Sequence, residues 1–73
     1  MKSDFKFLIA SPDDREELVC QIYYKGEGFV ELSQEGRKLE VEIYPPVKSK
    51  YWTIPYNELV DILVEAKKHL LQE

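Results

Sequence analysis

The stretch LVCQIYYKGEGFVELSQEGRKLEVEIY, residues 18–44, decides the fold of this 73-residue chain. Its runs of valine, isoleucine and tyrosine are typical of strands, because branched and aromatic side chains fit a pleated surface. Glycine-bearing turns separate the runs and supply the backbone freedom that hairpin loops need. The stretch therefore predicts consecutive antiparallel strands.

The pairing of these strands follows from their apolar positions. A three-residue loop over 26–28 opposes Tyr24 to Val30, and a two-residue loop over 35–36 sets Val30 against Val41. Two independent loops then give one consistent inner face, and such agreement across levels is evidence for the fold.

The first run leaves an alternative open. Residues 17–25 read as a strand, but a single helix over residues 12–25 also groups apolar side chains on one side. The density of valine, isoleucine and tyrosine favours a strand preceded by a turn or a single helical turn at Ser11 and Pro12.

The remaining elements lie at the two ends. Alternation from Phe5 to Ile9 indicates a strand, and an apolar stripe from Leu59 to Leu70 indicates an amphipathic helix. The expected strands span residues 4–10, 17–25, 29–34, 37–44 and, as an option, 51–54, and the helix spans 55–72. The sequence thus predicts one α+β domain over 1–73: an antiparallel meander of four strands, or five, with one C-terminal helix packed on one face.

Composition restricts the classes of function. The chain is 44% hydrophobic with a net charge of −4, which suits a soluble globular domain and argues against nucleic-acid binding. Its single cysteine excludes an internal disulfide. The N-terminal apolar run is too short for a signal peptide or a membrane span, so a cytoplasmic location and no membrane association are expected.

Catalytic and metal-binding patterns are weak. The Cys–His combination, Cys20 with His69, lacks activating neighbours, and the acidic residues between Asp13 and Glu17 lack the glycine and the ligand spacing of a calcium loop. No phosphate-binding glycine motif is present. We expect no cofactor, no bound metal and no enzymatic activity, and no small molecule is implied.

Two groups of residues are candidates for binding a partner. Tyr23, Phe29 and Tyr44 are expected to gather on the outer face of the sheet, near the first hairpin loop. The second group is Lys48, Lys50 and Tyr51. It belongs to the loop over residues 45–52, which is locally basic and stiffened by Pro45 and Pro46, whereas Trp52 is expected to enter the core.

These features support three hypotheses. The first is a small protein-interaction or self-associating module, in which a homodimer would extend a modest core. The second is a toxin-immunity-type inhibitor, because a small acidic domain suits a basic partner enzyme. The third is a small-ligand binder or enzyme that uses the loop over residues 45–52.

Overall fold

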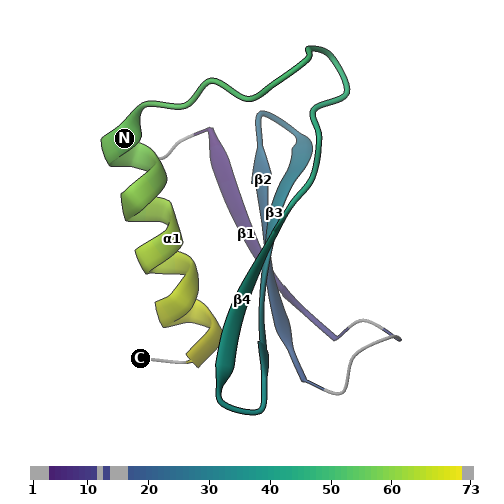
Figure 1. Cartoon of the computed structure of the whole chain (residues 1–73), viewed down its shortest axis with the longest axis vertical. Coiled ribbons are helices and arrows are strands. Elements are labelled where there is room, and N and C mark those ends of the chain that lie inside the picture. The colour runs from purple at the N-terminus through teal and green to yellow at the C-terminus, as the bar shows by residue number, and fades with distance from the viewer. Residues whose placement is uncertain (1–3, 12, 14–16, 72–73) are drawn as a thin grey trace.

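The fold is a single antiparallel sheet with one helix on its inner face (Figure 1). The structure, a computed structural model, describes residues 4–11, 13 and 17–71. Its elements are β1 (Phe5–Ala10), β2 (Val19–Tyr24), β3 (Glu27–Glu35), β4 (Lys38–Ile43) and α1 (Tyr56–Leu71). The strands pair in the order β1-β2-β3-β4, so the predicted α+β meander with a C-terminal helix is confirmed.

The open alternatives of the sequence are resolved at two positions. Residues 19–24 form a strand, so the single helix over 12–25 is wrong. Residues 51–54 form no strand, and they lie in the extended connection to α1. The turn expected at Ser11 and Pro12 falls partly outside the described residues, because the structure does not describe Pro12.

The first hairpin has a tighter loop than the sequence predicts. Tyr24 pairs with Glu27, so the loop consists of Lys25 and Gly26. Their φ angles are 52° and 86°, and two positive values are the signature of a type I′ turn. The predicted loop over 26–28 is wrong because the two-residue turn matches the twist of the strands better.

A β-bulge follows this turn and changes the position of Phe29. Ile22 pairs with Val30, whereas Tyr23 pairs with Gly28, so Phe29 is the extra residue on β3. Phe29 and Val30 therefore both point to the inner face, where they are 4% and 2% exposed. The prediction that Phe29 lies on the outer face is wrong, because a bulge breaks the two-residue alternation from which it was made.

The second hairpin is shifted by two residues from its predicted register. Glu35 pairs with Lys38, so the turn begins at Gly36, which has a φ of 64°. Val30 consequently pairs with Ile43, two residues further along β4 than expected. An even shift leaves every side chain on its expected face, which is why the inner-face assignment survives the wrong register.

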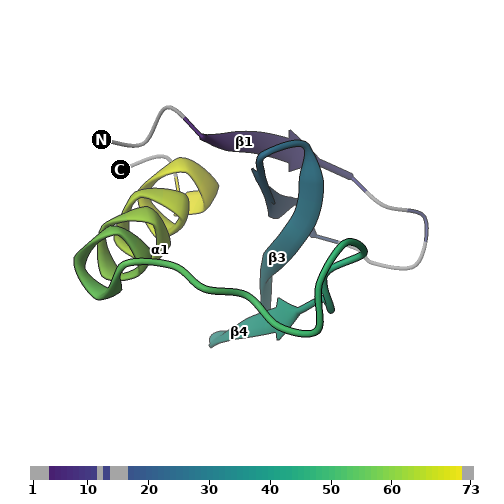
Figure 2. The same cartoon turned by 90° about the horizontal axis from the view of Figure 1, so that it is seen from above.

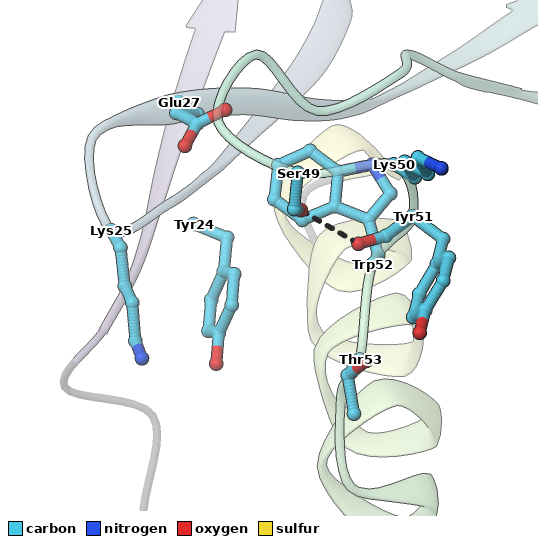
Figure 3. A pocket seen from close by; sticks show the side chains of 8 residues that line it. All are labelled: Tyr24, Lys25, Glu27, Ser49, Lys50, Tyr51, Trp52 and Thr53. Atoms are coloured by element: carbon cyan, nitrogen blue, oxygen red, sulfur yellow. Dashed lines mark hydrogen bonds between the residues drawn. The ribbon is translucent and has the colours of Figure 1, made fainter.

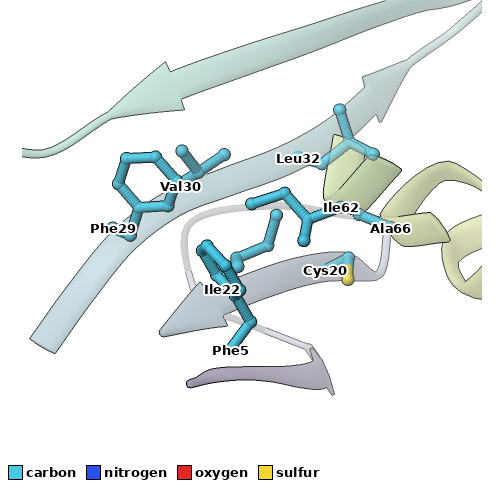
Figure 4. Packing of buried hydrophobic residues seen from close by; sticks show 8 residues of the cluster. All are labelled: Phe5, Cys20, Ile22, Phe29, Val30, Leu32, Ile62 and Ala66. Carbon is cyan, nitrogen blue, oxygen red and sulfur yellow. The ribbon is translucent and has the colours of Figure 1, made fainter. Parts of the chain in front are cut away.

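The core lies between α1 and the middle of the sheet (Figure 4). Ile62 and Ala66 of α1 are completely buried against Cys20 and Ile22 of β2 and their neighbours. The rest of the predicted helical stripe, from Leu59 to Leu70, packs partly buried around this cluster. Figure 2 shows α1 and β4 lying apart from each other. Among the described residues, the backbone of α1 lies close to β1, β2 and β3 but not to β4.

Candidate functional site

The inner face of β4 is apolar and uncovered. Leu39, Val41 and Ile43 point to the same side of the sheet as the core, yet they are 37%, 46% and 67% exposed. The sequence predicts the face of these side chains correctly, but it treats an inner face as a buried one. Because α1 packs over the first three strands, β4 extends beyond the helix and its apolar side chains meet water.

An apolar groove of about 280 Å³ lies between β4 and α1. We call it the β4–α1 groove; its lining residues are Phe29, Val30, Val41, Ile43, Trp52, Ile54, Leu59 and Leu63. The lining consists of aliphatic and aromatic residues only, and no charged side chain contributes to it. Such a groove can bind apolar side chains, but it offers few groups that would orient a small polar ligand.

The apolar surface continues onto one flank of α1. Val60 is 41% exposed and lies three residues before Leu63, so the two side chains are neighbours on the helix surface. Val64, which is 50% exposed, instead lines a separate hollow among charged side chains of α1. The opposite flank faces β1, since the ring of His69 lies tilted against the ring of Phe7, with 5.3 Å between their centroids. Val60 therefore extends the apolar surface on the flank of α1 away from β1, next to the β4–α1 groove.

The outer face of the sheet carries a polar network centred on Glu31, which is only 7% exposed. Gln21 Nε2 donates to Glu31 Oε1 at 3.4 Å, and the Tyr44 hydroxyl donates to the same oxygen at 3.3 Å. Tyr23 donates in turn to Gln21 Oε1 at 3.2 Å. Tyr23 and Tyr44 thus lie on the predicted face, but their hydroxyls already form hydrogen bonds within this network.

Two further outer-face positions are buried, which the sequence does not suggest. Val19 and Ser33 form a cross-strand pair, and they are 0% and 2% exposed. Ser33 Oγ has no hydrogen-bond partner among the residues that the structure describes. The alternation of β2 and β3 predicts a water-facing surface here, and alternation alone carries no information about burial of the second face.

The loop from Tyr44 to Trp52 is anchored at both ends. Val47 N donates to Glu27 Oε1 at 2.8 Å, and Trp52 Nε1 donates to Tyr44 O at 2.6 Å. The Trp52 ring meets the Phe29 ring edge-on, with 4.9 Å between centroids. Trp52, which was expected to enter the core, is partly buried and packs against it. These contacts hold the loop in one position beside the groove.

A second, more polar hollow of about 440 Å³ lies under this loop (Figure 3). Its lining residues are Tyr24, Lys25, Glu27, Ser49, Lys50, Tyr51, Trp52 and Thr53. Of the predicted basic group, Lys50 and Tyr51 line it, whereas Lys48 is exposed outside it. Figure 3 shows the ammonium groups of Lys25 and Lys50 directed away from one another, so the two cations do not converge on one ligand position.

Catalytic chemistry has little support in the described residues. Cys20 is completely buried among apolar side chains, and burial raises the pKa of its thiol, which makes the thiolate scarce. His69 lies 3.6 Å from Glu65 on the surface of α1. Within the described part of the chain, no three histidine, cysteine or acidic side chains gather as metal ligands would. The described helix is not long and apolar enough to cross a membrane.

Comparison of the chain with protein-family models, curated proteins and solved structures finds no match. Its candidate sites are therefore defined by its own geometry. The groove was missed at the sequence level, although one signal points toward it: an apolar face on the last strand of a meander, where a single helix is too narrow to cover every strand.

Proposed function

We propose that the protein is a non-enzymatic protein-interaction module that binds its partner on the open side of the β4–α1 groove. The observation that supports this most directly is the apolar face of β4, with Val41 and Ile43 exposed by 46% and 67%. Exposed apolar side chains beside an apolar groove are typical of a surface that another chain covers. Val60, which is 41% exposed on α1, enlarges the same surface.

The chemistry of the groove favours a polypeptide over a small molecule. A small-molecule site usually combines apolar walls with a few convergent polar groups that fix the orientation of the ligand. The β4–α1 groove has no charged lining residue, and its lining residues on β4, Val41 and Ile43, are exposed. A chain that supplies apolar side chains and its own backbone hydrogen bonds needs no such groups, and Trp52 and Phe29 supply aromatic area of the kind enriched at interfaces.

An inhibitor of a basic enzyme, of the toxin-immunity type, is a second candidate within the same class. Acidic character favours it: the net charge is −4, and Glu31, Glu40 and Glu42 lie together on the outer face of β3 and β4. Complementary charge accelerates association with a basic partner. This acidic surface lies on the opposite face of β4 from the groove, so substitutions at Val41 and Ile43 test binding in the groove separately from binding to the carboxylates.

The test compares three tagged versions of the protein in lysate of its native host. The first is the wild type, and the second carries Val41→Gln and Ile43→Gln, which make the exposed β4 face polar. The third carries Lys6→Gln, a control at an exposed position on the distant strand β1. Circular dichroism establishes that all three are folded.

We expect the wild type and the Lys6 control to capture a protein that the double variant does not capture. The purified partner should likewise bind the wild type and the Lys6 control more tightly than it binds the double variant. Sedimentation of the three versions detects a second copy as the partner. Identical captures from all three versions, together with monomers throughout, would exclude the groove as the binding surface.

A further inference from the structure

The free edge of β4 has backbone groups aimed away from the sheet. Tyr44 N donates to Phe29 O at 2.9 Å, so the N–H of Tyr44 points toward β3. Backbone direction alternates along an antiparallel strand, and Leu39, Val41 and Ile43 therefore direct their N–H and C=O groups to the other side. No strand in the described part of the chain pairs with that side, because β4 ends the sheet order.

The two faces of this edge differ in chemistry. Leu39, Val41 and Ile43 carry the exposed apolar side chains of the inner face, beside the β4–α1 groove. Glu40 and Glu42 alternate with them and project to the outer face. There Glu42 lies opposite Glu31 of the neighbouring strand β3. A strand laid along β4 would therefore meet apolar side chains on one face and carboxylates on the other.

We propose that β4 binds an extended segment of a partner protein by antiparallel strand addition, and that apolar residues alternate with lysine or arginine in this segment. The inference rests on the proposed function, since it names the chemistry of the partner at the same surface. The partner's apolar side chains pack against Val41 and its inner-face neighbours. Its cations lie opposite Glu40 and Glu42, and opposite charges across adjacent strands stabilise the pairing.

The ion pair of Glu40 leaves room for such a cation. Lys38 Nζ lies 3.9 Å from Glu40, but the two side chains are 79% and 47% exposed. An ion pair that is this exposed is weak and is readily exchanged for another. Pro45 follows the strand closely and limits its extension, so the bound segment is no longer than the six residues of β4.

A second copy of the chain fits this edge less well than a basic strand. Antiparallel self-pairing centred on Val41 places Glu40 opposite Glu42 of the other copy, and the same clash occurs twice by symmetry. Self-pairing centred on Glu40 sets Lys38 opposite Glu42 of the other copy, but it opposes the Glu40 carboxylate to its own copy and leaves Ile43 beyond the paired region. The neighbouring carboxylates Glu40 and Glu42 thus discourage pairing between copies, while they attract a strand of opposite charge.

The test is a nuclear magnetic resonance titration of the ¹⁵N-labelled protein with an acetylated peptide of alternating valine and lysine. A matched peptide carries glutamate in place of lysine. A second matched peptide is N-methylated at the backbone positions that would face β4. We expect amide shifts concentrated at Leu39, Val41 and Ile43, and affinity at least about tenfold weaker for the glutamate peptide, because two cross-strand attractions become repulsions.

Protein variants separate backbone pairing from side-chain contact. Val41→Pro removes an N–H that points away from β3, so the hydrogen bonds of the sheet itself are retained and binding of the lysine peptide is lost. Val41→Thr keeps that N–H and the branched shape, and it should bind with only a modest loss. If Val41→Pro does not fold, the N-methylated peptide tests the same hydrogen bonds from the ligand side, and it should not bind.

Three results would overturn the proposal. They are equal affinity for the lysine and glutamate peptides, shifts confined to the loop hollow or the outer face, and sedimentation showing a dimer through β4. If the peptide fails to bind while the Gln double variant still loses a captured partner, strand addition is wrong and the interaction module stands. If that variant also captures the same proteins as the wild type, the proposed function fails as well.

Discussion

The clearest quantitative consequence of the structure is that the same substitution should have different costs on β2 and β4. Ile22 and Ile43 both point to the inner face, but they are 0% and 67% exposed. Ile22 packs in the core against α1, whereas Ile43 borders the open groove. Replacing each by alanine therefore compares a covered and an uncovered position on one face of one sheet.

The expected costs follow from burial. Ile22→Ala removes fully buried atoms and leaves a cavity, which costs about 2–5 kcal/mol. For Ile43, complete burial of the three removed carbons would contribute about 2.4 kcal/mol. Because the side chain is 67% exposed, only about a third of this, about 0.8 kcal/mol, is lost, and no cavity forms. Loss of strand propensity adds up to about 1 kcal/mol at either position.

Urea unfolding followed by Trp52 fluorescence measures both costs, because this is the only tryptophan and its ring packs against Phe29. With an m-value of about 1 kcal/mol/M, Ile22→Ala should lower the midpoint by several molar and Ile43→Ala by less than about 2 M. If Ile22→Ala is unfolded in buffer, the Ile→Val pair at the two positions gives the same contrast on a smaller scale. Equal losses of stability in the two variants, or a loss at Ile43 that grows with protein concentration, would refute the conclusion that the inner face of β4 is uncovered.

Three further predictions concern the turn, the loop anchor and the thiol. Lys25→Asn should stabilise the protein by up to about 1 kcal/mol in urea unfolding, because Lys25 has a φ of 52° before Gly26 and asparagine tolerates this conformation better; a loss would contradict the turn assignment. Trp52→Phe should cost about 1 kcal/mol or more by circular dichroism, since it removes the donor to Tyr44 O at 2.6 Å; an unchanged midpoint would show that this bond does not anchor the loop. Cys20 should react with thiol reagents only when the protein opens. Because burial raises the pKa of this thiol in the folded state, the unfolded state ionises first. Stability therefore falls as pH rises above about 8.5, and Cys20→Ala should remove that part of the slope.

The sequence predicted the fold class because local signals agreed along the chain. Alternation placed Ile22 and Val41 on one face, and helical spacing placed Ile62 on the buried stripe of α1. Both hairpin registers were nevertheless wrong, because the turn chemistry of Lys25 and Gly36 was misread. The inner-face residues kept their faces, because the register shift is even along β4 and, beyond the bulge, between β2 and β3. Phe29 moved from one face to the other through the bulge.

The candidate site was predicted less well. Lys50 and Tyr51 do line a hollow, and Tyr23 and Tyr44 lie on the outer face, but the β4–α1 groove involves none of them. It includes Phe29, which the sequence had assigned to the other face. Groove residues come from β3, β4, the loop and α1, and nothing in their local sequence shows that these segments meet around an open space.

By itself, the sequence determined what each segment becomes and which side chains share a face, because those properties depend on neighbours two to four residues away. Only the tertiary structure decided which apolar side chains are covered. Burial depends on where one helix rests on a twisted sheet, and α1 rests on β1, β2 and β3. Val41 and Ile43 therefore have the pattern of core residues and the exposure of a binding surface, since α1, the helix of the described residues, packs on the other strands.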